Sequence, residues 1–170
     1  RVQVLDGGFE AWLAEGGGSV TEVPPPAVPT AVPVRDYADV LVDGAEVADA
    51  LARDAIMLVD ARAADRFAGR NETIDPVAGH VPGARSMPFT GNVGAGQRWL
   101  DAAALRRRWQ PLVQQAGARP LVAMCGSGIT ACHNLLALAA AGVDNTRLYA
   151  GSWSQWITDP SRAVATGEAS

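Results

Sequence analysis

The chain has 170 residues, of which 48% are hydrophobic and 19% are charged, and its formal net charge is −4. This is the composition of a globular protein that is long enough to bury a core, and no apolar run approaches the roughly 18 residues that a membrane-spanning helix needs. All 14 basic residues are Arg, and the acidic balance argues against nucleic acid or an anionic membrane as the main partner. The only two Cys, Cys125 and Cys132, suffice neither for a metal site nor for a secreted disulfide framework, which predicts a protein of the reducing cytoplasm.

A short internal repeat suggests how the chain is divided. Residues 4–12 and 148–156 both have the pattern of a short strand, a Gly-containing turn and a helix that carries Trp. We therefore expect residues 1–18 to be the last strand and helix of a preceding domain and residues 36–168 to be a complete second domain. Chance similarity of so short a stretch is the alternative. Residues 19–35, which are rich in Pro and follow three consecutive Gly, are expected to be a linker without regular structure.

Beyond the linker, helical and strand patterns alternate. Asp43 and Glu46 have the spacing of a capping box, which predicts a helix from there to about residue 53. The apolar run at residues 56–59 predicts a strand buried on both faces, and residues 63–69 look helical.

The second half of the chain continues this alternation. A helix is expected around Leu105, Trp109 and Leu112, a buried strand at 121–124, a helix at 130–141 that ends at Gly142, and a short strand at 148–149. Strands that alternate with helices indicate an α/β domain with a mostly parallel sheet.

The chemistry is expected at Cys125, which lies where the strand at 121–124 ends. In open parallel sheets, ligands bind beyond the carboxyl ends of the strands. Two Gly in the following loop allow its N–H groups to point inward, and the start of the next helix adds partial positive charge; both favour a thiolate. A buried structural Cys before a Gly turn is the alternative, and the pattern alone does not separate the two. The loop expected to hold the anion consists of Gly126, Ser127, Gly128, Ile129 and Thr130.

A Cys-dependent phosphatase also uses an anion-binding loop after a strand. That chemistry requires an Arg six residues after the Cys, because its guanidinium holds the phosphoryl oxygens in the transition state. This chain has Ala131 at that position. The spacing therefore argues against a phosphatase.

The loop at residues 125–131, Cys-Gly-Ser-Gly-Ile-Thr-Ala, resembles the active-site loop of the rhodanese superfamily in the form found in 3-mercaptopyruvate sulfurtransferases. The resemblance extends over residues 40–160. It implies a rhodanese-like three-layer domain, α/β in class, with a mostly parallel central sheet flanked by helices. It also implies that the chain is the C-terminal catalytic half of a tandem-domain sulfurtransferase, with the missing N-terminal rhodanese domain as a partner. The further signatures that resemble the family, in the same order, are Asp60-Ala61-Arg62, Arg66-Phe67, residues 79–84 and residues 148–156.

The resemblance implies a sulfurtransferase. Cys125 would take a sulfane sulfur from a small-molecule donor, become a persulfide, and pass the sulfur to cyanide, a thiol or a thioredoxin-like acceptor. No metal or organic cofactor is needed. The alternative is a catalytically inactive rhodanese-like module that binds proteins, although such modules usually lack the Cys that is present here.

The donor is expected to be 3-mercaptopyruvate or thiosulfate. The loop lacks the basic side chains of family members specialised for thiosulfate, which favours mercaptopyruvate. Arg66 matches one substrate-binding Arg of the family and would pair with the donor carboxylate in a bidentate way. At the position of the second such Arg this chain has Asp75, and Arg70 is the candidate to replace it. Asp60 and Arg62 are expected to support the site as an ion pair or loop anchor.

The remaining conspicuous side chains have simpler interpretations. His80 lies in a Gly- and Pro-containing loop, where stabilising a turn is the expected role. Cys132 is expected in the core, because it shares a predicted helical face with Leu residues, and His133 is expected to make a helix-packing or surface contact. Trp153 and Trp156 are expected in the core or at a contact between domains.

Overall fold

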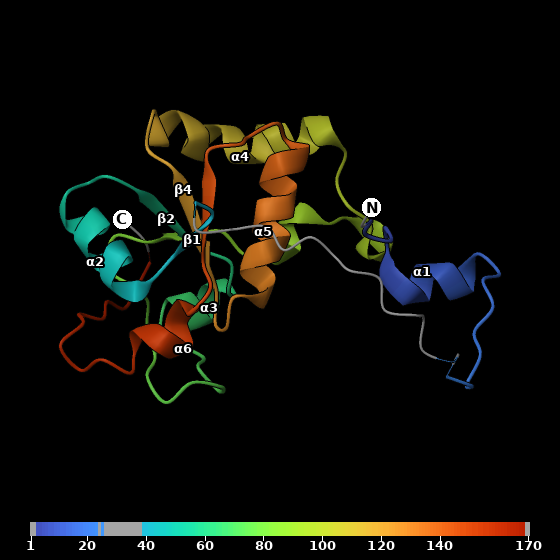
Figure 1. Ribbon diagram of the computed structural model, residues 1–170, viewed down its shortest axis with the longest axis horizontal. Coiled ribbons are helices and arrows are strands. Elements are labelled where there is room, and N and C mark those ends of the chain that lie inside the picture. The colour runs from blue at the N-terminus through green and yellow to red at the C-terminus, as the bar shows by residue number, and fades with distance from the viewer. Residues whose placement is uncertain (1–2, 24, 26–38, 169–170) are drawn as a thin grey trace.

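Five parallel strands form a central sheet in the computed structural model, which describes residues 3–23, 25 and 39–168 (Figure 1). Every pair of neighbouring strands is parallel, and the order across the sheet is β1-β5-β4-β2-β3. The strands are β1 (Leu41–Val42), β2 (Met57–Asp60), β3 (Arg85–Ser86), β4 (Leu121–Met124) and β5 (Thr146–Tyr149).

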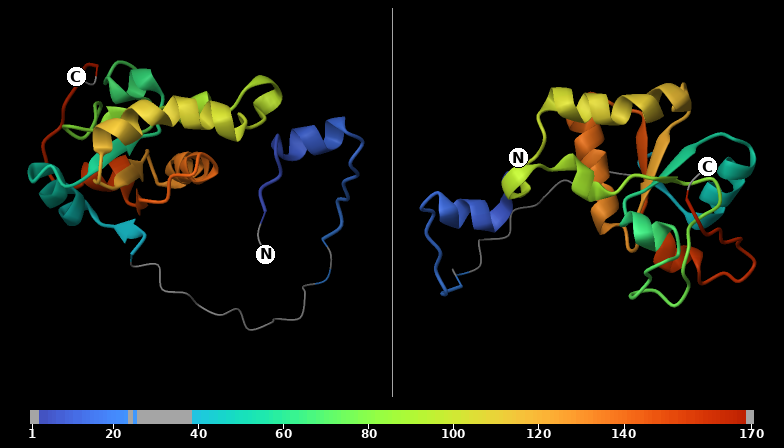
Figure 2. Two further views of the ribbon diagram at one scale, coloured as in Figure 1. Left: turned by 90° about the horizontal axis from the view of Figure 1, so that it is seen from above. Right: turned by 180° about the vertical axis from the view of Figure 1, so that it is seen from behind.

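Helices pack on both faces of the sheet and give the domain three layers (Figure 1, Figure 2). Side chains of α4 and α5 belong to the core on one face, and those of α2, α3 and α6 to the core on the other. This arrangement confirms the predicted α/β fold with a parallel central sheet. The helices are α1 (Gly8–Ala14), α2 (Gly44–Ala52), α3 (Ala64–Phe67), α4 (Ala102–Ala116), α5 (Ile129–Ala140) and α6 (Ser152–Trp156), with short 3₁₀ helices at Phe89–Asn92 and Ala95–Gln97.

The side chains of β4 alternate between the two cores. Leu121 and Ala123 pack on the side of α4 and α5, whereas Val122 and Met124 pack on the side of α2 and α6. A strand that is buried on both faces is mostly apolar, which explains why the two central strands were predictable from continuous apolar runs. The observed strand β2 begins one residue later than predicted, at Met57.

The predicted start of helix α2 is confirmed in detail. The Asp43 carboxylate accepts the N–H groups of Ala45 and Glu46, and the Glu46 carboxylate accepts the N–H of Asp43 at 2.8 Å. The helix expected around Leu105, Trp109 and Leu112 is α4, which continues through Pro111 to Ala116. Strands β1 and β3 were not predicted, because an element of two residues is too short to show a period.

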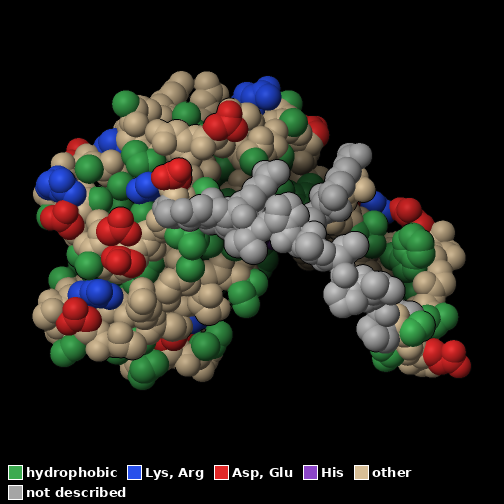
Figure 3. Space-filling model, viewed as in Figure 1, with side chains coloured by type: hydrophobic (Ala, Val, Ile, Leu, Met, Phe, Trp, Pro, Cys, Tyr) green, Lys and Arg blue, Asp and Glu red, His purple; other side chains and the backbone are tan. Residues whose placement is uncertain are grey.

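Helix α1 lies beside the domain and buries none of its own residues (Figure 2). The Asp6 carboxylate accepts the N–H of Trp99 at 2.8 Å, and Arg98 pairs with Glu15 after the helix. The apolar side chains of this segment remain exposed, as Figure 3 shows at the end of the molecule that α1 occupies. They are Val4, Leu5, Phe9, Trp12 and Leu13.

The expected linker at residues 19–35 falls mostly outside the described residues. Its described part at residues 19–23 forms neither helix nor strand. Over the described stretches of the chain, the helices are all too short or too polar to cross a membrane.

Candidate active site

Cys125 directly follows β4, at the carboxyl edge of the sheet. The residue is 2% exposed, and its side chain lies where the core beneath α5 meets a cavity. The N–H of Gly128 donates to Cys125 Sγ at 3.1 Å. A peptide N–H in this position stabilises negative charge on the sulfur.

Gly128 is the residue that makes this loop geometry possible. Its φ of +86° is in the left-handed region, which favours glycine. A Cβ at this position would lie 2.7 Å from the carbonyl oxygen of Ala150, in the connection between β5 and α6. The close approach therefore packs the cysteine loop directly against that connection.

Hydrogen bonds from the start of α6 fix the backbone of the cysteine loop. The Cys125 N–H donates to Ser152 Oγ at 3.0 Å, and the Ser152 hydroxyl donates to the carbonyl of Tyr149 at 2.9 Å. The N–H groups of Trp153 and Ser154 donate to the carbonyls of Cys125 and Gly126, both at 2.9 Å. The loop is thus held from the end of the neighbouring strand β5.

Ser152 is a positioning residue that sequence reasoning missed. It is fully buried and has a φ of +53°, which is uncommon for any residue except glycine. A residue holds such a conformation only where its surroundings determine it. Here the determinant is the bridge that its hydroxyl makes between Cys125 and Tyr149. Nothing in the local sequence signals this bridge.

A cavity of about 380 Å³ opens at Cys125. It brings most of the predicted site residues together: Cys125, the loop residues other than Gly128, and both Arg62 and Arg66 line it. Arg70 does not line it and instead pairs with Glu168 at 2.7 Å, with both side chains largely exposed. The lining residues are Arg62, Ala63, Arg66, Ile74, Asp75, Phe89, Cys125, Gly126, Ser127, Ile129, Thr130 and Ser154.

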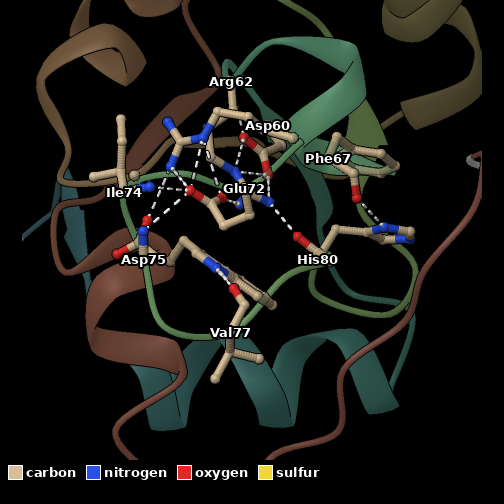
Figure 4. Close-up of polar contacts among 12 residues, drawn as sticks. Asp60, Arg62, Phe67, Glu72, Ile74, Asp75, Val77 and His80 are labelled. Atoms are coloured by element: carbon tan, nitrogen blue, oxygen red, sulfur yellow. Dashed lines mark hydrogen bonds and ion pairs between the residues drawn. The ribbon is translucent and has the colours of Figure 1, made fainter. Parts of the chain in front are cut away.

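A chain of alternating charges connects the end of β2 to residues that line this cavity. Figure 4 shows Asp60, Arg62, Glu72 and Asp75 among its members. The Arg62 Nη2 contacts Asp60 Oδ2 at 2.7 Å, and both side chains are almost completely buried. The Glu72 carboxylate lies between the two arginines, at 3.6 Å from Arg62 and 2.8 Å from Arg66. Arg66 in turn contacts Asp75 at 3.0 Å. Asp60 and Arg62 therefore form the ion pair that was expected, and Glu72 connects it to Arg66.

Glu72 is a second residue that sequence reasoning missed. Burial by itself raises the pKa of this carboxyl. Hydrogen bonds from Arg66 and from the N–H groups of Asp75 and Ile74 outweigh the burial and hold the pKa below its ordinary value of 4.5. The group is therefore ionised at neutral pH and holds Arg66 at the edge of the cavity.

Arg66 is positioned by carboxylates of its own chain. Its Nε and Nη2 contact Glu72, and Nη2 also contacts Asp75. Within the described part of the chain, only Nη1 of this guanidinium is without a hydrogen-bond partner. A Cβ added at Gly126 would lie 3.9 Å from Nη1, so this nitrogen is close to the residue that follows Cys125.

Two His interpretations agree with the structure. His80 stacks on Phe67 with ring centroids 3.8 Å apart, and its Nδ1 lies 2.8 Å from the Phe67 carbonyl, which stabilises the loop. His133 stacks on Trp99 at 4.2 Å and contacts Phe89 edge-on. Burial lowers the pKa of His133. Neither ring lines the cavity at Cys125.

The predictions for the remaining residues have mixed outcomes. Trp153 and Trp156 are buried in the core on the side of α2 and α6, as expected. The prediction of a buried Cys132 was wrong, because this side chain is exposed on α5. Among the side chains that the structure describes, no group of three or more His, Cys, Asp or Glu is placed to hold a metal ion.

Fold and site together define a three-layer α/β protein with a cysteine in a glycine loop at the carboxyl edge of a parallel sheet. The chain belongs to the rhodanese-like domain family, which it matches over residues 43–159.

Two curated relatives show how the chain compares with longer proteins. It is 47% identical to the probable 3-mercaptopyruvate sulfurtransferase of Pseudomonas aeruginosa, over 98% of this chain and 58% of that protein. It is 34% identical to the thiosulfate sulfurtransferase of Cricetulus griseus, over 98% of this chain and 57% of that protein. The chain thus spans less than three-fifths of the length of either relative.

The fold also recurs in a solved structure, the anaerobic ergothioneine biosynthesis enzyme from Chlorobium limicola in complex with trimethyl histidine. The TM-score is 0.81, with 21% sequence identity, 97% of this chain and 41% of that chain covered. At this identity the similarity shows the fold alone.

The contact at Gly128 makes a testable prediction for stability. Gly128→Ala combines an unfavourable φ with a collision against a backbone carbonyl, so we expect it to lower the free energy of unfolding by about 3 kcal/mol. Gly142→Ala is the matched control: its φ is +83° but nothing lies within 4 Å, and the conformational term alone should cost about 1 kcal/mol. Urea unfolding at neutral pH measures both. Equal losses in the two variants would show that the loop is not tightly packed on Ala150.

Proposed function

We propose that this chain is the sulfur-transferring part of a sulfurtransferase that works through a persulfide on Cys125. The observation that carries the proposal is the position of Cys125 Sγ, which accepts the Gly128 N–H and lines a cavity that also contains Arg66. Family membership and the names of the two relatives support it. The inactive binding module is the alternative, and the retained Cys with its N–H donor argues against it.

The reaction consists of two displacements at sulfur. The Cys125 thiolate attacks the thiol sulfur of 3-mercaptopyruvate or the outer sulfur of thiosulfate and forms an S–S bond. The bond from that sulfur to the donor breaks, and its electron pair leaves on the enolate of pyruvate, which takes up a proton, or on sulfite. A thiolate or cyanide then attacks the outer sulfur and releases the Cys125 thiolate. Every step moves an electron pair between sulfur and its partner, so no separate oxidant or reductant takes part.

The residues around Cys125 fit these steps. The Gly128 N–H faces the sulfur in both its thiolate and its leaving-group role. The loop backbone is held by Ser152, so this donor needs no rearrangement during the reaction. Arg66 Nη1 lies near Gly126, the residue after Cys125, and would bind the anionic end of the donor.

The persulfide can be detected as an increase in the mass of the protein. Incubation with either donor should add one sulfur atom to the protein, and cyanide should remove it again. Cys125→Ser should abolish the adduct, whereas Cys132→Ser, which removes the exposed second Cys, should retain it. Intact-protein mass spectrometry gives the answer. If neither donor adds sulfur to the folded protein, the binding-module alternative replaces the transferase.

A second prediction assigns the donor-binding Arg. Arg66→Lys keeps the charge but cannot hold Glu72, Asp75 and a donor anion in a fixed fork, so we expect KM for the donor to rise by about tenfold. Arg70→Ala removes an exposed pair with Glu168, and KM should stay within about twofold of wild type. Steady-state kinetics separates the two. An equal rise in KM for Arg70→Ala would move the donor site away from Arg66.

We also propose that residues 1–18 end a preceding domain of the same type. Helix α1 buries none of its residues and exposes a group of apolar side chains that includes Phe9 and Trp12 (Figure 3). Such a surface is typical of an interaction site, and the two relatives are long enough to contain a further domain.

Hydrogen exchange tests this assignment. The amides of α1 should exchange at least about tenfold more slowly in a protein extended upstream of Arg1 than in residues 1–170 alone, because the preceding domain would cover the helix. Amides of α5 serve as the control and should be equally protected in both. Unchanged exchange in α1 would separate this segment from any preceding domain.

A further inference from the structure

Arg66 offers less of its guanidinium to a ligand than the sequence suggests. A bidentate carboxylate needs two parallel N–H groups. Glu72 occupies Nε and one hydrogen of Nη2, and Asp75 Oδ2 occupies the other at 3.0 Å. Only Nη1 is left for a donor, so the bidentate pairing expected from the sequence is not available while Asp75 stays in place.

Asp75 is held at this position from both sides. Its Oδ2 contacts Arg66, and its Oδ1 accepts from the Ser154 hydroxyl at 2.9 Å. A Cβ added at Gly126 would lie 3.9 Å from Asp75 Oδ2, the same distance as from Nη1 and Nη2 of Arg66. An anion that approaches the nucleophile loop therefore meets a fixed carboxylate as closely as it meets the guanidinium.

The charge around the cavity is also unbalanced. The ion-pair chain contains two guanidinium groups, on Arg62 and Arg66, and three carboxylates, on Asp60, Glu72 and Asp75. One carboxylate is in excess before the sulfur of Cys125 is counted. The member of the chain that lines the cavity with a carboxylate is Asp75.

We propose that Asp75 selects the donor by charge: its carboxylate covers the edge of Arg66 that lies near Gly126, the residue after Cys125, so that singly charged donors are accepted and doubly charged donors are disfavoured. The proposal rests on the proposed function and narrows the donor to a thiol-bearing monocarboxylate of the mercaptopyruvate type, against the dianion thiosulfate. Coulomb energy is proportional to the charge of the ligand, so the penalty for a dianion is twice that for a monoanion. Because affinity depends exponentially on energy, the factor by which Asp75 weakens binding of a dianion is the square of the factor for a monoanion.

Non-transferring anions test the selection without depending on turnover. Pyruvate carries one negative charge and sulfate two at pH 7.5, and each should protect Cys125 from alkylation by the neutral reagent iodoacetamide. The measurement uses the Cys132→Ser background, so that Cys125 is the single reactive thiol. Removing the repelling charge by Asp75→Asn should lower the half-protecting concentration of pyruvate about threefold and that of sulfate about tenfold.

The matched control is Asp49→Asn, which removes the same charge from an exposed Asp–Arg pair on α2. It should change neither half-protecting concentration. Asp75→Ala is the second variant, in case an amide at this position disturbs Ser154, and the same larger gain for sulfate is expected. Melting curves show that each variant compared is folded.

The outcomes separate this inference from the proposed function. Charge selection would be overturned if the half-protecting concentrations of pyruvate and sulfate changed equally or not at all. It would also be overturned if both anions protected Cys125 less well in both Asp75 variants. Neither conclusion depends on the transfer activity. A charge-dependent gain would support it even if the donors add no sulfur to Cys125. In kinetic terms, selection by Asp75 predicts that Asp75→Asn lowers KM for thiosulfate more than KM for mercaptopyruvate.

Discussion

The candidate site depends on the attachment of the cysteine loop to the start of α6. The N–H of Cys125 is bound by Ser152 Oγ, the carbonyl of Cys125 accepts from Trp153, and Gly128 packs on the carbonyl of Ala150. These contacts use the polar backbone groups of the loop that would otherwise be free to turn. They leave the Gly128 N–H facing the sulfur. A donor that is fixed in advance costs no reorganisation when charge develops on its acceptor, which is why a loop without a charged side chain suffices here.

The sequence predicted those parts of the site that depend on local pattern. A buried strand followed by Cys and two Gly places a cysteine at the carboxyl edge of the sheet, and strand and helix lie close to where the pattern predicted them. Ser152 was not predictable, because its role requires a positive φ and a partner 27 residues away. Glu72 and Asp75 were not predictable for a similar reason. Their segment, residues 70–79, forms neither helix nor strand, so no period indicates which way a side chain points.

The wrong prediction for Cys132 has a physical cause on the same helix. The apolar pattern placed Cys132 on a buried face, but the fully buried positions of α5 include Asn134, a polar residue. Asn134 is buried because its amide is satisfied: it accepts from Asn92 at 2.7 Å and donates to the carbonyl of Met87 at 2.8 Å. A buried amide costs little when both of its ends are bonded. A prediction from hydrophobicity alone treats such a residue as exposed. The buried face of the helix is then predicted on the side that carries Cys132 instead of the side that carries Asn134.

The ion-pair chain connects the position of Arg66 to that of the loop that follows Cys125. Buried charges are costly, and a chain of five of them is poor evidence for stability. What the chain does here is to hold side chains in place. Asp60 and Arg62 hold Glu72. Glu72 in turn holds Arg66 beside Gly126. The chain then closes on the nucleophile loop, because the Ser154 hydroxyl lies within hydrogen-bond distance of both Asp75 and the carbonyl of Gly126. An anion that displaced Asp75 from Arg66 would therefore also disturb a contact to the residue next to Cys125. Under the proposed function, donor binding and the geometry of the cysteine loop are thus coupled through one carboxylate.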